Sequence, residues 1–143
     1  MSDIFCDVPI RAPQDVVFRA VSTPAGLNAW WTKTSAGNAV AGAEFELGFG
    51  PEYNWRARVT KCTSPSEFEL QLLQSDPDWL GTRVGFRLEP QGQLTQLRFY
   101  HTGWPTANEH WRVSCYCWPI YLRLLRRHLE HGELVPYEQR LDV

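Results

Sequence analysis

The hydrophobic period of this chain changes from two to about 3.6 within the stretch from Leu94 to Gly132. The first part alternates, which predicts a strand that buries Thr95, Leu97, Phe99 and His101 on one face. After a short turn, apolar residues recur at intervals of four, three, four, three and four, at Trp111, Cys115, Trp118, Leu122, Leu125 and Leu129. This spacing is one stripe of a long helix, so a strand leads directly into a helix that can cover a sheet.

The expected helix carries a signal at each end. Thr106 and Glu109 stand in the register of a capping box, and Gly132 suits a left-handed stop. About 25 residues at roughly 1.5 Å each give a rod of about 37 Å, enough to cross a small sheet. Pro119 falls in mid-helix, where it removes one backbone donor, so we expect a bend near it.

The remaining segments predict the sheet and two short helices. Alternation over residues 4–10 predicts a first strand, and helical spacing after Pro13 and after Thr23-Pro24 predicts two short helices. Over residues 43–101 the period is two, interrupted by turn signals, which predicts five strands joined as an antiparallel meander. We therefore predict an α+β fold: a curved six-stranded antiparallel sheet, with two short helices after the first strand and a long C-terminal helix across the concave face.

Composition restricts the classes of partner. The 143 residues are expected to form one domain, residues 1–143. A net charge of -2 and a pI near 6.1 argue against nucleic acid or an anionic membrane as the main partner. The first residues lack a basic segment followed by an apolar run, and no stretch has the length of a transmembrane helix. We therefore expect a cytoplasmic protein that does not insert into membranes, with its four cysteines as free thiols.

Several short segments together resemble one known family. They are Ile10-Arg11-Ala12-Pro13, Val17-Phe18, Trp30-Trp31, Gly42, Trp79-Leu80-Gly81-Thr82, residues 95–104, Trp118, Tyr121-Leu122 and Glu130-His131-Gly132. On these residues the chain resembles the START-like (SRPBCC) superfamily with the birch-pollen-allergen type of helix-grip fold. More closely, it resembles the group named after the activator of the ninety-kilodalton heat-shock protein ATPase. The resemblance implies a cavity for hydrophobic small molecules, which members use for transport, sensing, polyketide ring closure or chaperone contact.

The predicted inner faces supply a binding set but no catalytic constellation. They contain no Asp, Glu, Lys or Arg, although hydrolases usually need a carboxylate pair or a nucleophile with its base. No catalytic residue is assigned; His101 is the one candidate, because its imidazole can orient or protonate a bound carbonyl. The alternative is a partly buried histidine bonded to a neighbouring backbone group or to the turn at Thr102-Gly103. The residues expected to bind the ligand are Trp31, Phe45, Trp55, Leu72, Trp79, Phe86, Phe99, His101, Trp104, Trp111, Cys115, Trp118 and Leu122.

Two other pairs imitate reactive or metal-binding sites. Ser114 follows His110 by four residues, but no nucleophile elbow accompanies them. His128 and His131 have no cysteine or carboxylate set at zinc spacing, so a solvated helix end explains them better. We expect neither a metal nor a cofactor.

Three functions remain open on this reasoning. The first is binding of a small hydrophobic molecule of lipid, polyketide or aromatic type, the second a polyketide cyclase or aromatase using His101, and the third a chaperone-regulating interaction module. An empty cavity of roughly 300 Å³ would cost about 7 kcal/mol, a large part of a typical total stability. The cavity must therefore hold ligand or water, or be plugged by aromatic rings.

A homodimer through an edge strand or the tail is compatible with the sequence.

Overall fold

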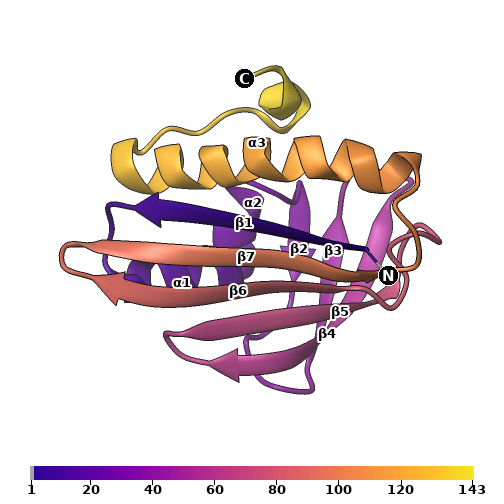
Figure 1. Cartoon of the computed structure of the whole chain (residues 1–143), viewed down its shortest axis with the longest axis horizontal. Coiled ribbons are helices and arrows are strands. Elements are labelled where there is room, and N and C mark those ends of the chain that lie inside the picture. The colour runs from indigo at the N-terminus through magenta and orange to yellow at the C-terminus, as the bar shows by residue number, and fades with distance from the viewer. Residues whose placement is uncertain (1) are drawn as a thin grey trace.

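The alternating segments form one antiparallel sheet in the computed structural model, which describes residues 2–143. Strand order is β1-β7-β6-β5-β4-β3-β2, and a long helix, α3, runs alongside β1 across the curled sheet (Figure 1). The elements are β1 (Ser2–Ile10), α1 (Gln14–Ser22), α2 (Pro24–Asn28), β2 (Thr34–Ala36), β3 (Glu44–Gly48), β4 (Asn54–Thr63), β5 (Glu67–Gln74), β6 (Arg83–Gln91), β7 (Leu94–Trp104), α3 (Glu109–His131) and the 3₁₀ helix η1 (Tyr137–Asp142). The predicted helix-grip α+β class is confirmed.

The sheet has seven strands where the sequence predicts six. The additional strand is β2, which follows the two short helices and pairs with the far edge of the meander through Ser35 opposite Leu47. A strand of three residues is too short to display an alternating pattern, so its period could not identify it. The five-strand meander β3 to β7 and the antiparallel pairing of β1 with β7 agree with the predicted order.

The core lies between the concave face of the sheet and the helices. The alternating pattern predicts which residues of the meander face inward, and among them Phe49 and Trp55 are only partly buried. The other apolar residues of this predicted set are almost completely buried: Phe45, Leu47, Ala57, Val59, Phe68, Leu70, Leu72, Val84, Phe86, Leu88, Leu97 and Phe99. Helix α3 contributes Trp118, Leu122 and Leu125 from its predicted stripe, and the two short helices contribute Val17, Val21 and Leu27. The inward residues of the strands, spaced by two, and those of α3, spaced by about 3.6, therefore pack in one core.

Helix α3 begins two residues later than the capping box predicts. Its N-cap is Asn108, whose side-chain oxygen accepts a hydrogen bond from the backbone N–H of Trp111 at 2.9 Å. The predicted Thr106 cap is therefore wrong, and Thr106 is exposed before the first helical residue. The predicted stop is confirmed, because Gly132 has φ of 69° in the left-handed region and its N–H bonds the carbonyl of His128.

The chain after α3 is anchored by a buried arginine. Arg140 is 6% exposed and donates to three carbonyl oxygens: Thr32 O at 3.1 Å, Asn28 O at 2.7 Å and Val135 O at 3.2 Å. The sequence predicts that Val135, Tyr137 and Leu141 pack this tail. Val135 packs against the core and Tyr137 is partly buried, but Leu141 is 48% exposed. Carbonyl groups at the end of α2 and just after it thus hold the tail together with this packing. Within residues 2–143, no helix is long and apolar enough to cross a membrane.

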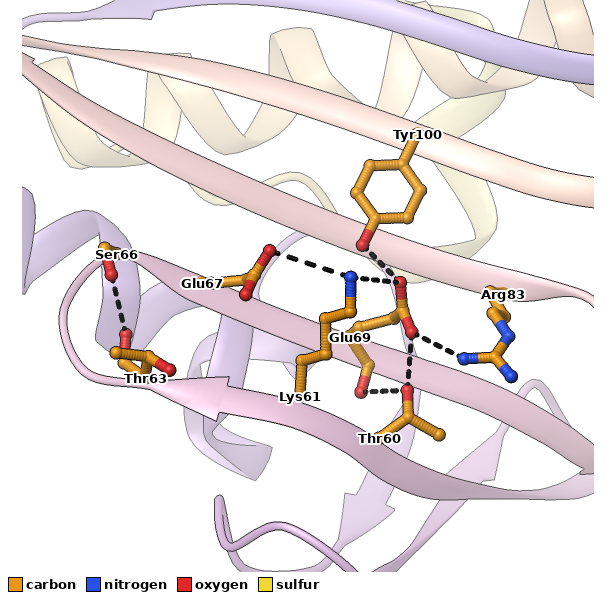
Figure 2. A network of polar contacts seen from close by, with 8 residues as sticks. All are labelled: Thr60, Lys61, Thr63, Ser66, Glu67, Glu69, Arg83 and Tyr100. Carbon is orange, nitrogen blue, oxygen red and sulfur yellow. Dashed lines mark hydrogen bonds and ion pairs between the residues drawn. The ribbon is translucent and has the colours of Figure 1, made fainter.

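A carboxylate is buried on the outer face of the sheet, where Figure 2 shows side chains from four strands converging. Glu69 on β5 is only 3% exposed. A register shift between Val59 and Lys61 in β4 places both Thr60 and Lys61 against it. Glu69 Oε1 accepts from Thr60 Oγ1 at 2.7 Å and from Arg83 Nη1 at 3.1 Å.

Tyr100 on β7 completes this cluster from the other side. Its hydroxyl donates to Glu69 Oε2, and its ring occupies the space that a Cβ on Gly85 would need. Burial raises the pKa of Glu69, but the hydrogen bonds from Tyr100, Thr60 and Arg83 and the charge of Lys61 outweigh it, so the pKa is lowered. The partners therefore stabilise an ionised carboxylate that fastens β4, β5, β6 and β7 together.

Replacing Glu69→Gln should lower the free energy of unfolding by about 1–3 kcal/mol, because three donors lose a charged acceptor. The lowered pKa gives a stabilisation that is present above pH 4.5, the ordinary value, and is lost as the pH falls through the folded-state pKa. Urea unfolding at neutral and acidic pH measures both effects. Glu46→Gln, an exposed residue of β3, is the control and should change stability by less than about 0.5 kcal/mol.

Replacing Asn108→Ala should cost about 1 kcal/mol of stability, since the Trp111 N–H loses its acceptor at the start of α3. Thr106→Ala tests the cap that the sequence predicts and should cost only a few tenths of that. Thermal unfolding of both variants decides between the two positions. A larger loss for Thr106→Ala would contradict the observed helix start.

Candidate ligand-binding site

The residues that the sequence assigns to the ligand site lie on facing walls of the core. Ten of them are buried: Trp31, Phe45, Leu72, Trp79, Phe86, Phe99, His101, Trp104, Trp118 and Leu122. The remaining three, Trp55, Trp111 and Cys115, are partly buried against the same core. The strands supply one wall and α3 the other, because β7 leads into α3 through a turn of four residues.

Most of these side chains contact one another directly. Trp118 of α3 packs against Phe99 of β7 at a centroid distance of 4.5 Å and against Trp31 at 5.3 Å. Trp79, in the loop before β6, stacks on Trp118 at 5.8 Å and meets Trp55 at 5.1 Å. We call these five rings, with His101 and Trp104, the aromatic cluster. Its rings fill much of the space between the sheet and α3.

The structure also distinguishes residues that the prediction grouped together. Phe45 packs against Phe68 at 5.8 Å, in a separate group of rings with Phe18. Conversely, Phe49 joins the cluster through Trp31 at 5.5 Å and Trp55 at 5.0 Å, although it was not among the predicted site residues. Its position in the alternating pattern of β3 was the available signal, since it follows Phe45 and Leu47 with the same parity.

His101 lies at the centre of the cluster and uses both ring nitrogens. Trp118 Nε1 donates to His101 Nδ1 at 3.1 Å. On the other side, Thr82 Oγ1 lies 2.8 Å from His101 Nε2 and donates its own proton to Trp79 O at 2.6 Å. Thr82 therefore accepts from Nε2–H, and the bonds assign the neutral tautomer protonated at Nε2.

The surroundings of His101 oppose protonation. Burial, and secondly the charge of His110, lower the pKa of His101 to about 3. A second proton on Nδ1 would also remove the acceptor that Trp118 needs. At neutral pH the imidazole is therefore uncharged and fully hydrogen-bonded. Its partners are the side chains of Thr82 and Trp118, and not the backbone or the turn at Thr102-Gly103 that the sequence suggests.

Three indole N–H groups near this centre have no hydrogen-bond acceptor. The Nε1 atoms of Trp79, Trp104 and Trp111 are buried and unpartnered among residues 2–143. By contrast, Trp30 Nε1 donates to Ala20 O at 3.0 Å, and Trp118 Nε1 donates to His101. A buried donor without an acceptor costs about 1–3 kcal/mol, so three of them mark a region that lacks acceptor oxygens.

The unpartnered indoles lie where a loop meets the start of α3. Asp78 in that loop accepts from Asn108 Nδ2 at 3.1 Å through one oxygen and contacts His110 Nδ1 at 3.1 Å through the other. His110 also stacks on Trp79 at 6.2 Å. Residues 76–82 thus connect to α3 at its first turn through one carboxylate and ring contacts.

Hollows on the described surface lie mostly outside the predicted set. One of about 400 Å³ is lined by Thr34, Ser35, Glu46, Leu47, Gly48, Asn54, Trp55, Arg56 and Gln74. Another of about 290 Å³ lies between β1 and α3 and is lined by Cys6, Asp7, Val8, Pro9, Pro119, Arg123 and Arg126. Both open to solvent, and the first shares only Trp55 with the predicted lining.

The pairs that imitate catalytic or metal sites acquire other partners. His110 bonds Asp78, and His128 Nδ1 lies 3.3 Å from Glu133 O, beyond the helix end. Across residues 2–143, no group of three or more His, Cys, Asp or Glu side chains is placed to hold a metal ion. The four cysteines are free thiols.

Comparison with known proteins gives one family and many solved structures of similar fold. The chain resembles the Aha1 dimer from Colwellia psychrerythraea, with 28% identity, a TM-score of 0.84 and coverage of 93% of this chain and 99% of that one. Protein BH1534 from Bacillus halodurans is 27% identical, with a TM-score of 0.73 over 91% of this chain and 98% of that one. CalU16 from Micromonospora echinospora, at 22% identity, shares the fold, with a TM-score of 0.74 over 96% and 83%.

A search of curated proteins finds no match. The family described as Activator of Hsp90 ATPase homolog 1-like protein matches residues 11–130, from the end of β1 to the last turn of α3. The match contains strands β2 to β7, the aromatic cluster and nearly all of α3, and β1 lies just before it. The chain therefore belongs to the Activator of Hsp90 ATPase homolog 1-like family, within the SRPBCC superfamily.

Proposed function

We propose that the protein binds a small hydrophobic molecule that carries hydrogen-bond acceptor oxygens, between the sheet and the first turns of α3. The observation that carries this proposal is the set of three buried indole N–H groups without acceptors, on Trp79, Trp104 and Trp111. A flat apolar ligand suits the neighbouring rings, and its oxygens would satisfy the donors.

Energetics favour a site of this kind over a permanently open cavity. An empty apolar cavity of roughly 300 Å³ would cost about 7 kcal/mol, and the aromatic cluster avoids that cost by filling the space. The remaining cost is about 1–3 kcal/mol for each unpartnered donor. A ligand that supplies acceptors recovers this cost and can offset the movement of rings needed to admit it.

The loop of residues 76–82 is the segment suited to move. Asp78 ties it to α3 through Asn108 and His110. Trp79, which the loop also carries, adds ring packing on Trp118 and His110. Displacing the loop would expose Trp104 and Trp111 while the bonds between Trp118 and His101 keep the middle of α3 on the sheet. The proposed entrance is therefore at the N-terminal end of α3.

We also propose that the chain forms a homodimer. The supporting observation is the solved dimer from Colwellia psychrerythraea, which is similar to this chain over 99% of its own length. Sedimentation velocity of the purified protein tests the proposal. A single species of monomer mass at all concentrations up to about 1 mM would contradict it.

His101 is proposed to support the binding cluster rather than to transfer a proton. Its neutral imidazole holds Trp118 on one side and Thr82 on the other, and neither nitrogen is free for a substrate carbonyl. An acid whose pKa is about 3 is almost entirely deprotonated at neutral pH, which opposes a cyclase mechanism through this residue.

The variants Trp104→Phe and Trp30→Phe test the cost of the unpartnered donors. Both tryptophans are 0% exposed, but only Trp30 has an acceptor for its N–H. Without ligand, Trp30→Phe should lose about 1–3 kcal/mol more stability than Trp104→Phe, because it leaves Ala20 O without a donor. Urea unfolding measures the difference, and equal losses would mean that the Trp104 donor carries no penalty.

The same two variants test binding with a probe that has both required features. Anilinonaphthalene sulfonate, with fused rings and sulfonate oxygens, should bind the wild type and bind Trp104→Phe about tenfold more weakly. Pyrene has no acceptor, so its affinity for the variants should differ much less from its affinity for the wild type. Fluorescence titration measures both, and the proposal fails if the protein binds neither probe or if Trp30→Phe weakens sulfonate binding as much as Trp104→Phe does.

The pH dependence of stability tests the neutral state of His101. Its pKa is lowered from 6.5 to about 3, so the unfolded chain binds one more proton in this range. The stabilisation is complete above pH 6.5 and is lost toward pH 3, with a slope of about 1.4 kcal/mol per pH unit. His101→Gln should remove this component of the slope between about pH 4 and 6, whereas the exposed control His131→Gln should keep it.

A further inference from the structure

Helix α3 carries a second stripe on the side opposite its core contacts. The positions are again spaced four, three, four, three and four, and the residues are Glu109, Val113, Tyr116, Ile120, Arg123 and Arg127. At 100° per residue this stripe points away from the one that contains Trp118 and Leu122. Its centre is apolar and its ends are charged, with an acid near the helix N-terminus and bases toward the C-terminus.

The apolar centre of this stripe is open to solvent. Tyr116 is 71% exposed and Val113 is 51% exposed, while Ile120 is partly exposed between them and the tail. The tail returns along the C-terminal half of α3, where Leu124 is buried, and η1 lies over the middle of the helix, so the first turns of α3 stay uncovered (Figure 1). Apolar residues at three consecutive stripe positions are what a helix–helix contact requires.

The charges at the ends of the stripe are free to pair with another molecule. Within the part of the chain that the structure describes, neither Glu109 nor Arg123 belongs to an ion pair. Arg127, by contrast, is held by Glu133 at 2.8 Å. The unpaired acid and base stand symmetrically about one residue: Glu109 is seven positions before Tyr116 and Arg123 is seven positions after it.

We propose that this stripe is the contact between two copies of the chain, with their α3 helices packed antiparallel about a twofold axis at Tyr116. The axis would place Tyr116 against the partner's Tyr116 and Val113 against the partner's Ile120. Each Glu109 would then face the partner's Arg123. This inference rests on the proposed homodimer and assigns its surface.

Self-complementarity favours a second copy over a different partner. In a twofold contact the same patch serves both molecules, so position i meets position j and j meets i. The stripe satisfies this condition in its apolar residues and its charges. In an antiparallel pair, Arg123 of each helix lies near Glu109 of the other, and the two apolar centres lie against each other. Stripes with three- and four-residue spacing pack at a small crossing angle, which keeps all these positions in contact.

The substitution Tyr116→Lys tests the surface directly. It places two like charges together at the axis and should raise the dimer dissociation constant by about a hundredfold or more. Phe5→Lys is the matched control, since Phe5 is also an aromatic residue that is 71% exposed but lies on β1. This control should dissociate at the wild-type concentration, and circular dichroism should show intact folds for both variants.

Charge reversal tests the pairing and its register. Glu109→Arg and Arg123→Glu should each weaken the dimer, because each creates two like-charged contacts in a twofold assembly. The double variant should restore most of the wild-type dissociation constant, an outcome that a loss of helix stability alone would not produce. Sedimentation velocity over a concentration series measures all of these variants.

The outcomes test the proposed surface on α3 separately from the proposed homodimer. A wild type that remains monomeric overturns the proposed homodimer and this surface together. A wild-type dimer that Tyr116→Lys leaves unchanged, or that Phe5→Lys disrupts equally, overturns the α3 surface and leaves the homodimer standing. Failure of the double charge reversal to restore affinity overturns the antiparallel register.

Discussion

The hydrogen bond from Trp118 to His101 is the contact on which the arrangement of sheet and helix depends. It joins the middle of α3 to the last strand, and His101 passes the connection to Thr82 and the carbonyl of Trp79. The chain of hydrogen bonds runs in one direction only, because the indole, the imidazole and the hydroxyl each donate one hydrogen bond to the next group. A charged imidazole would break it, so the burial that keeps His101 neutral also preserves this link between β7 and α3.

This constraint explains why the interior is a set of interlocked rings and not an empty cavity. Trp118 lies against Phe99 while it donates to His101, and Trp79 and Trp31 pack on its remaining surfaces. The rings farther toward the loop of residues 76–82 have no such polar partner, which leaves the Nε1 atoms of Trp79, Trp104 and Trp111 without acceptors. The centre of the cluster is therefore fully hydrogen-bonded, whereas one end has N–H donors without acceptors. A ligand with acceptor oxygens would gain the most binding free energy at that end.

Much of the fold could be predicted because its strongest features are periodic. The inward residues of β3 to β7, the stripe of α3 and the stop at Gly132 depend on local pattern, and each is observed. Strand β2 was missed because three residues show no period. Thr106 was predicted as the cap from its register with Glu109 alone, whereas the observed cap, Asn108, is also held by a hydrogen bond to Asp78 from a distant loop. The partners of Arg140, Glu69 and His101 are far away in sequence, so no local signal identifies them.

The two stripes of α3 make its inner and outer contacts interdependent. The inner stripe follows the sheet through Trp118 and Leu122, while the outer one presents Tyr116 on the opposite side of the same helix. A ligand that enters near the first turn of α3 must shift either the loop of residues 76–82 or the helix. If the helix moves, a contact centred on Tyr116 moves with it, and linkage requires the dimer to change the affinity for that ligand by the same factor as the ligand changes dimer affinity. If only the loop moves, the two equilibria are independent, so the dissociation constant of the dimer with and without bound ligand distinguishes the two ways of admitting it.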